Sequence, residues 1–424
     1  MLLSCFSTVL YAVAGTARRA RPVLFLLLAW LFAGRTYAQD STLTRFIRQH
    51  QYPLTLTGQQ FAGAGWDQLQ QSIRKSQFVL VGEDHGMAQI PVFTAAVARV
   101  FQPAVFVAEV DPYVAQDITA LAAQPGPPTA YLQRYPEALC FANWVEEFEL
   151  IRTLRAQRVQ LLGLDQVFMM TAGRFYERLA GQAQGKPAKA YLQQRAAAYQ
   201  AQGQVFEKEG GSKSSMLVQP QSAIDSLVAI TRREGPAVQQ MVQDYVTSYQ
   251  IYQGQIHGTG GHQERLNLMK RNLLRYLRTY QATAARPLPK MLFKFGANHL
   301  ARGVSVATFG EFYDVGNLVQ NLADAQDQKS LHVMIMGKQG MLASGSNQMN
   351  PSKNVAPYTA ADNAFMMPFF DQTTGPAWNV VDLRPARRAL TSGKLQLTSP
   401  ALQRILLGYD YVVVIPETTV SHIF

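Results

Sequence analysis

A short apolar run in this sequence ends in a glycine, two carboxylates and an imidazole. Residues 78–81 are followed directly by Gly82, Glu83, Asp84 and His85. Such a run ending in glycine is typical of a buried strand that enters a tight turn. Ligands of α/β sheets bind beyond the carboxyl ends of the strands, so this turn is a candidate site. A structural interpretation is also open, in which Asp84 caps the following helix and His85 is an exposed loop residue.

The same pattern recurs further along the chain. Three other short apolar runs end in Glu109, in Asp165 and, just after Gly296, in His299. Parallel strands place their carboxyl ends along one edge of a sheet, and four such endings would therefore meet there. The recurrence favours a functional site over a single helix cap.

Two chemistries suit the residues at these strand ends. Imidazole and carboxylate groups are ligands for a divalent metal that activates water. Alternatively, an imidazole is the general base, and a neighbouring carboxylate fixes its tautomer and stabilises its cation. The sequence leaves both mechanisms open. The candidate catalytic residues, which are also the candidate metal ligands, are Glu83, His85, Glu109 and His299.

A predicted helix after the glycine-rich turn 258–261 adds an arginine to this set. Arg265 and Asn272 are seven residues apart, which places them on one helical face. An arginine that reaches an acidic cluster either neutralises it or stabilises an oxyanion in a transition state, so Arg265 is a fifth catalytic candidate. The residues expected to contact the substrate are Asp165, Asn272, Asn298 and His262.

The periodicity of the chain changes twice. Strand and helix patterns alternate from residue 78 to 165 and return after residue 286, which predicts an α/β fold with a mainly parallel central sheet flanked by helices. Between them, strand signals are absent and apolar residues recur at helical spacing, for example in the stripe that follows Pro236. The predicted parts are a first half of the α/β core (39–166), a large helical insertion (167–286) and a second half of the core (287–424).

Two segments of the predicted core have weak strand signals. Residues 39–76 are polar and are expected to form a lead-in with one helix over 66–74. Residues 338–376 are rich in Gly, Ser, Asn and Pro, which predicts a long loop near the site or a lid.

The amino-terminal segment has the three parts of a secretory signal. A basic stretch, Arg18–Arg21, precedes the apolar residues 23–32 and the small residues before Gln39. We therefore predict removal of residues 1–38, a periplasmic or secreted location and no stable membrane insertion afterwards. A second apolar block, residues 2–15, leaves an uncleaved anchor open.

The charge pattern limits the kinds of binding partner, and the cysteine content excludes an internal disulfide in the exported chain. The 424-residue chain has a net charge of +11, but no Lys/Arg run is interleaved with aromatic residues. We expect no nucleic-acid partner and a small-molecule substrate. Cys140 would be the one cysteine left after signal removal, so the exported chain would fold without an internal disulfide.

The ordered motifs resemble those of the erythromycin-esterase-like proteins, and they are similar to the wider group that contains the ChaN-like, TraB and Tiki proteins. The resemblance covers residues 77 to 310 or so, and implies a hydrolase-like site with the reactive histidine at His85 and Glu83 beside it. It also implies a strand-end glutamate at Glu109 and a second histidine at His299. The matching motifs are Gly82-Glu83-Asp84-His85-Gly86, Ala108-Glu109, Gly163-Leu164-Asp165, Arg265-x-x-x-Met269-x-x-Asn272 and Gly296-Ala297-Asn298-His299.

This chain departs from the esterase pattern at two points. The spacing of Glu83 and His85 is nearer the ChaN-like form, and Leu266 stands where the esterases usually have an acid. Two functions therefore follow. The first is an exported hydrolase whose His/Glu site activates water on an ester, lactone or amide, with or without a divalent metal. The alternative is a module of ChaN-like type that binds haem or a metal-bearing ligand without turnover.

Overall fold

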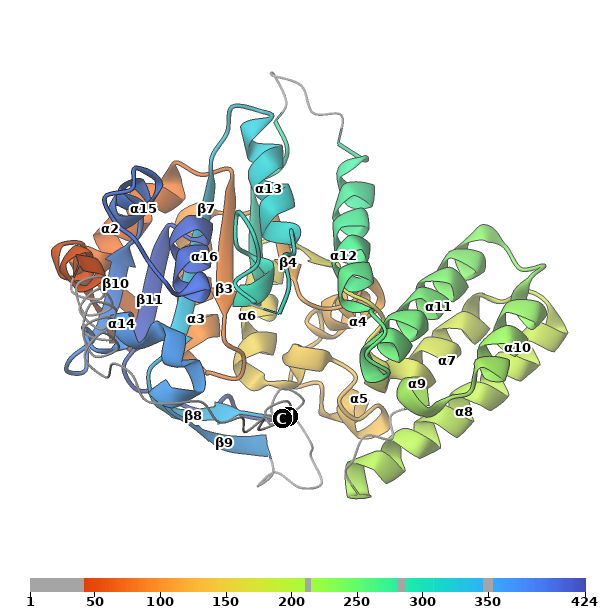
Figure 1. The fold of residues 1–424 in the computed structure, drawn as a ribbon. Helices are drawn as coiled ribbons and strands as arrows, with labels where there is room; N and C mark the ends of the chain where they lie inside the picture. Colours follow the sequence, from red (N-terminus) through yellow and green to blue (C-terminus); the bar gives the residue numbers. More distant parts are fainter. Residues whose placement is uncertain (1–41, 210–214, 281–286, 308, 346–353) are drawn as a thin grey trace, which may run out of the picture.

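A large, mainly parallel sheet forms the centre of the molecule (Figure 1). The computed structural model describes residues 42–209, 215–280, 287–307, 309–345 and 354–424. Within these residues the strand order is β2-β1-β10-β11-β7-β3-β6-β4-β5, parallel from β11 to β5 and antiparallel at β10, β1 and β2. The predicted α/β class with a mainly parallel sheet is confirmed. The strands are β1 (Gln51–Thr57), β2 (Gln60–Ala62), β3 (Phe78–Glu83), β4 (Val105–Ala108), β5 (Gln160–Gly163), β6 (Met291–Gly296), β7 (Ser330–Gly337), β10 (Trp378–Asp382) and β11 (Tyr411–Ile415).

Helices cover both faces of this sheet. Alternate residues of β3 pack into two different cores: Val79 and Val81 into one, Phe78 and Leu80 into the other. Strands buried on both faces are read as continuous apolar runs, which is why residues 78–81 have no polar alternation. The first core is covered by α2 (Ala64–Arg74), α3 (Gln89–Phe101), α4 (Pro112–Leu121) and α6 (Val145–Ala156). The second is covered by α12 (His262–Leu277), α13 (Val315–Asp324), α14 (Met367–Phe370), α15 (Arg384–Thr391) and α16 (Pro400–Gly408).

The chain between β5 and β6 forms a helical block beside the sheet (Figure 1). Pro236 opens α11 in its first turn, as expected from the sequence. The block has its own core, which includes Phe175, Tyr176 and Tyr245. The next helix, α12, instead buries Met269 against the second core of the sheet. The helices of the block are α7 (Ala172–Gln182), α8 (Lys186–Glu209), α9 (Ser215–Val218), α10 (Gln221–Thr231) and α11 (Pro236–Ile256).

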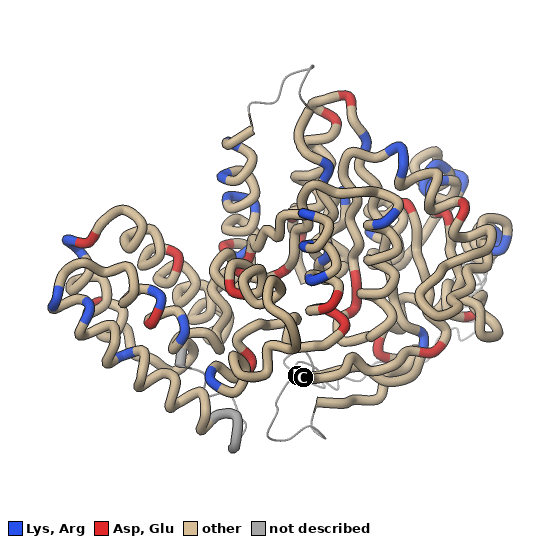
Figure 2. The backbone as a smooth tube through the Cα atoms, turned by 180° about the vertical axis from the view of Figure 1, so that it is seen from behind, with Lys and Arg blue, Asp and Glu red and all other residues tan. Residues whose placement is uncertain are grey.

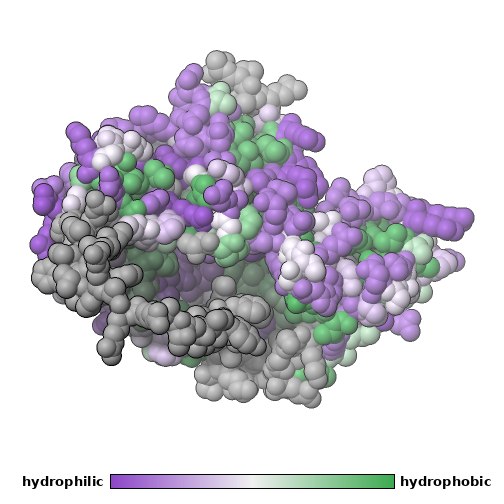
Figure 3. Space-filling view, viewed as in Figure 1, coloured by the Kyte–Doolittle hydropathy of each residue, from purple (hydrophilic) through white to green (hydrophobic). Residues whose placement is uncertain are grey.

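Charged side chains join this helical block to the α/β core. Asp117 of α4 lies 2.8 Å from Arg174 and 2.6 Å from Arg178, both on α7. The face of the molecule seen in Figure 3 is mostly hydrophilic, with apolar residues in patches over the core and over the helical block. The division at residues 166 and 286 stays a prediction.

The structure corrects the two segments with weak strand signals. Residues 39–76 contain strands β1 and β2 ahead of α2, and not a helix alone. The signal in β1 is weak because Pro53 interrupts it and because its partner β10 lies more than 300 residues away. Residues 338–376 are not one loop, since they contain β8 (Gly340–Ala343), β9 (Val355–Tyr358) and α14.

The predicted signal, residues 1–38, lies outside the described residues. Among the helices that the structure does describe, none combines the length and the apolar character that a bilayer crossing requires.

Candidate functional site

The sheet topology brings four polar strand ends together. The strands β3, β6, β4 and β5 are consecutive neighbours, and all of them run in the same direction. Their carboxyl ends supply Glu83 with His85, then His299, Glu109 and Asp165. In Figure 2, acidic and basic segments lie next to one another in this central part of the molecule. Direct contacts join the five residues that are expected to be catalytic. These are Glu83, His85, Glu109, His299 and Arg265.

Glu109 is the centre of the cluster. Its Oε1 accepts a hydrogen bond from Arg265 Nη2 at 2.8 Å, and its Oε2 accepts one from the backbone N–H of Gly296 at 2.7 Å. The two imidazoles approach from either side, His299 Nε2 at 3.3 Å from Oε1 and His85 Nε2 at 3.5 Å from Oε2. Burial would raise the pKa of this carboxyl, but the two histidines hold it well below its usual range. Glu109 is therefore an anion at neutral pH.

His85 is the more accessible of the two imidazoles. Its Nδ1 lies 2.8 Å from Glu83 Oε1, and its ring stacks on Phe141 with 4.1 Å between the centroids. The side chain is 29% exposed, compared with 8% for His299, so it is the group that a ligand can reach. Burial opposes the imidazolium, but Glu83 and Glu109 outweigh it and raise the pKa of His85 to about 10.

His299 has a comparable arrangement with a different acid. Its Nδ1 lies 2.6 Å from Asp314 Oδ2. Asp314 is the N-cap of α13, where its side chain also accepts the backbone N–H of Val315. Burial again opposes the cation, and Asp314 and Glu109 raise the pKa of His299 to about 10. Both histidines thus lie between two carboxylates.

Arg265 ties the β5 end to this cluster. Its Nε and Nη2 donate to the two oxygens of Asp165 at 2.9 and 2.6 Å, a bidentate pair that fixes the plane of the guanidinium. Asn272, two turns further along α12, donates to the carbonyl of Leu164 at 2.7 Å. The contacts of Asp165 and Asn272 are therefore made within the protein, and they position Arg265 and the β5 end.

Asn298 and His262, the other two residues expected to contact a substrate, are not among the residues that contact Glu109. The Asn298 side chain is exposed, while its carbonyl accepts from Ser305. His262 is half-buried at the start of α12, with its ring edge-on to Phe309 and Phe312. Burial and the nearby cations His299 and Arg265 lower the pKa of His262. His262 is therefore uncharged at neutral pH, and it lies near the cations His299 and Arg265.

The sequence did not indicate four residues that contact the cluster. Asp314 and Phe141 lie in segments without a local pattern, and Glu147 lies in the first turn of α6, where acids are common in any helix. Lys294 carried the clearest signal, since it is a charged residue within the apolar strand β6. Its Nζ lies 2.5 Å from Glu83 Oε1 and 2.5 Å from Glu147 Oε1.

The donor set fits a network of ion pairs better than a divalent metal. Lys294 donates to Glu83 and Arg265 donates to Glu109, so two fixed cations already lie on the carboxylates that a metal would need. A divalent ion at the same oxygens would be repelled by both. In the part of the chain that the structure describes, no group of three or more His, Cys, Asp or Glu side chains is arranged to hold a metal ion. The metal-free use of these residues is the one that their contacts support.

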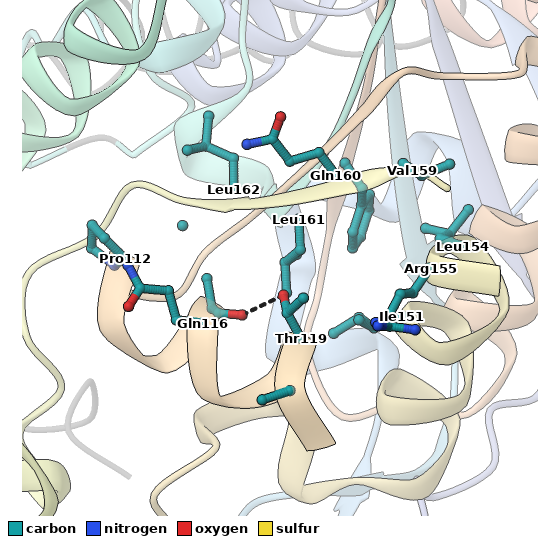
Figure 4. Close-up of a pocket in the computed structure, with 14 residues that line it drawn as sticks. Pro112, Gln116, Thr119, Ile151, Leu154, Arg155, Val159, Gln160, Leu161 and Leu162 are labelled. Atoms are coloured by element: carbon teal, nitrogen blue, oxygen red, sulfur yellow. Dashed lines mark hydrogen bonds between the residues drawn. The ribbon is translucent and has the colours of Figure 1, made fainter. Parts of the chain in front are cut away.

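A separate cavity lies on the outer side of the sheet edge (Figure 4). It has a volume of about 480 Å³ and opens between β5, α4 and α6, with Leu161, Ile151 and Leu154 among its lining residues. None of the candidate site residues lines it. The cavity is therefore not the space in which the strand-end groups act.

The comparisons with known proteins agree on the fold. The chain superposes on an erythromycin esterase mutant in its open conformation over 84% of its own length and 94% of the other, with a TM-score of 0.51 and 12% identity. A protein from Bacillus cereus matches over 91% of this chain and 99% of that one, with a TM-score of 0.56 and 13% identity. A succinoglycan biosynthesis protein matches with the same coverage, a TM-score of 0.56 and 12% identity. No protein-family model and no curated protein matches the sequence.

The expected similarity to the erythromycin-esterase-like structures is thus confirmed for the fold. A haem-bound ChaN of Campylobacter jejuni matches over 68% of this chain with a TM-score of 0.28 and 9% identity. At identities of 12 to 13%, similarity establishes an architecture, and the chemistry has to be argued from the site itself.

Gly296 lies close to both imidazoles and to Glu109, and this close approach gives a first prediction. A Cβ at this position would lie 3.1 Å from His85 Nε2 and 3.5 Å from Glu109 Oε2. Its φ of −52° suits any residue, so Gly296→Ala should fold normally. The His85 ring would have to move by a few tenths of an ångström, so we expect turnover to fall by less than the ~10²-fold that a displacement of roughly 1 Å costs.

A matched control for this variant is Gly303→Ala, where an added Cβ meets nothing within 4 Å. The measurement is turnover of a chromogenic ester together with the thermal unfolding midpoint. Full activity of Gly296→Ala would show that the close approach of His85 to Gly296 is not required.

Proposed function

We propose that this chain is an exported hydrolase in which His85 activates water for attack on an ester, lactone or amide of a small molecule. The observation that carries the proposal is the accessible imidazole of His85, held between the carboxylates of Glu83 and Glu109. Glu83 accepts a hydrogen bond from Nδ1–H of His85, so Nε2 is the nitrogen that exchanges a proton with a ligand. The fold shared with an erythromycin esterase is consistent with hydrolysis but does not specify the substrate.

In the proposed reaction, neutral His85 removes a proton from water at Nε2 as the water oxygen forms a bond to the carbonyl carbon. The resulting imidazolium lies beside Glu109, whose negative charge stabilises it. Arg265 and His299 are cations on the other oxygen of Glu109, and they favour the negative charge that develops on the carbonyl oxygen. The bond to the leaving group then breaks, and the leaving group takes a proton from an imidazolium.

The direct test is a panel of p-nitrophenyl esters, aliphatic lactones and p-nitroanilides with the purified chain. We expect turnover of at least one class, and we expect EDTA to leave the rate unchanged because the site residues are paired with one another. Turnover that EDTA abolishes and zinc restores would overturn the metal-free mechanism. Absence of turnover across all three classes would count against the hydrolase.

The pH dependence of the rate gives a second prediction. The carboxylates Glu83 and Glu109 outweigh burial and raise the pKa of His85 to about 10, far above the value of about 6.5 for an ordinary histidine. Because a base acts in its neutral form, turnover should rise about tenfold per pH unit until the pH passes this pKa. The measurement is a pH–rate profile corrected for spontaneous hydrolysis. A rate that falls over the same range would assign His85 as the acid.

Haem binding is the alternative function. A histidine ligates iron through a neutral nitrogen, but both imidazoles of the cluster face carboxylates that favour their cations. We therefore expect a visible-absorption titration with haemin to be flat. A sharp Soret shift that is lost in His85→Gln or His299→Gln would favour the binding module over the hydrolase.

Export is proposed from the amino-terminal sequence alone. Amino-terminal sequencing of the mature protein should begin at Gln39. A chain that is retained in the membrane and begins at Met1 would show that the segment is an anchor.

A further inference from the structure

Lys294 is a charged residue within the otherwise apolar and buried strand β6. It lies within β6, opposite Val81 of β3 and Ala108 of β4, and its side chain is 4% exposed. A buried ammonium is costly unless it is paired and hydrogen-bonded. A well-packed apolar residue would often stabilise such a position equally well, so stability alone does not account for the charge.

The contacts of Lys294 lead to the reactive end of the site. Its Nζ donates to Glu147 Oε1 on α6 and to Glu83 Oε1, both at 2.5 Å. The same Glu83 oxygen is the partner of His85 Nδ1 at 2.8 Å. Glu147, Lys294, Glu83 and His85 therefore form one chain of alternating charges, of which His85 is the accessible end.

We propose that the buried pair of Lys294 and Glu147 is a positioning device that sets how much negative charge Glu83 presents to His85. This inference rests on the proposed function, in which the protonation of His85 decides the rate. The Lys294 ammonium is bound to the same oxygen of Glu83 as His85. Its positive charge weakens the attraction between Glu83 and an imidazolium at His85. Glu147 neutralises part of that ammonium and so acts in the opposite direction.

The surroundings of His85 allow this pair to act. The carboxyl group of Glu147 changes its charge near neutral pH, because burial raises its pKa to about 7 and outweighs the opposite effect of the Lys294 ammonium. Lys294 does not reach a ligand, so it is a positioning residue and not a catalytic one. The charged groups that face His85 or its immediate partners are Glu83 and Asp84 of its own turn, Glu109 after β4, Glu147 of α6, Arg265 of α12, Lys294 of β6 and His299 after β6.

The two members of the pair should shift His85 in opposite directions. Lys294→Met removes a positive charge next to Glu83, so the pKa of His85 should rise. Glu147→Gln keeps an acceptor for Lys294 but removes a negative charge, so the pKa of His85 should fall by about one unit, the lower end of the effect of a neighbouring charge. Lys294→Arg keeps the charge and should stay near the wild-type value.

The experiment is an NMR titration of the histidine ring signals in the full mature chain, with the His85 signal identified by its loss in His85→Gln. Lys290→Met is the matched control, since Lys290 is exposed and precedes the same strand. If Lys294→Met does not fold, Glu147→Gln decides alone, because it changes no size and keeps a hydrogen-bonding side chain.

Shifts of opposite sign, with a parallel shift of the acid limb of the pH–rate profile, would support the proposal. A pKa of His85 that is the same in Glu147→Gln and wild type, or that shifts in the same direction in both variants, would overturn it and leave the pair a structural one. The titration needs no turnover. A chain without hydrolase activity but with opposite shifts would therefore refute the proposed function and not the positioning role of Lys294 and Glu147.

Discussion

Replacing His85 by Ala is expected to lower turnover by about 10²–10⁴-fold, the range found for a positioned general base. The imidazole is the accessible group of the strand-end cluster, and its removal leaves Glu83 and Glu109 without an intervening proton carrier. The fold should remain, because His85 lies in the loop after β3, where its ring stacks on Phe141. The measurements are turnover of the best ester or lactone of the panel and the thermal unfolding midpoint.

His85→Gln and His50→Ala complete this experiment. The glutamine keeps a polar group beside Glu83 but cannot act as a base, so it should be as inactive as the alanine variant. His50 precedes β1, which is separated from β3 by three strands of the sheet, and its loss should leave turnover unchanged. An active His85→Ala enzyme with normal kinetics would remove His85 from the mechanism.

The strand ends of this site could be predicted from the sequence because their signal is local. An apolar run that stops at an ionisable residue is visible within ten residues, and this local signal indicates Glu83, Glu109 and His299. The parallel direction of the strands then brings distant segments to one edge of the sheet, as the contacts between Glu109, His85 and His299 show.

The remaining residues of the network could not be predicted because their roles arise only from packing. Glu147 and Lys294 are 147 residues apart in the sequence. They meet because α6 packs on the sheet face to which Lys294 points. The sequence around Asp314 has no local pattern, and only the segment between β6 and α13 places this N-cap against His299. The strand β1 cannot be predicted for a similar reason, because its pairing with β10 has no local signature.

Replacing Arg265 by Met is expected to have the second large effect, on both stability and turnover. The guanidinium makes two hydrogen bonds to Asp165 and one to Glu109, and these carboxylates are largely buried. Loss of one partner from such a network leaves uncompensated charge and costs about 3–5 kcal/mol in the free energy of unfolding. Loss of a cation beside the developing oxyanion should lower turnover by a further factor of about 10²–10³.

The variant pair Arg265→Met and Arg265→Met/Asp165→Asn separates these two effects. The second substitution removes the charge that the first leaves unpaired, so urea unfolding should recover much of the lost stability while turnover stays low. Arg271→Met is the matched control, since Arg271 lies on the same helix with an exposed side chain and should change neither quantity. If the double variant regained both stability and turnover, Arg265 would be a structural cation that holds Asp165, and the oxyanion role would pass to His299, the other cation on Glu109.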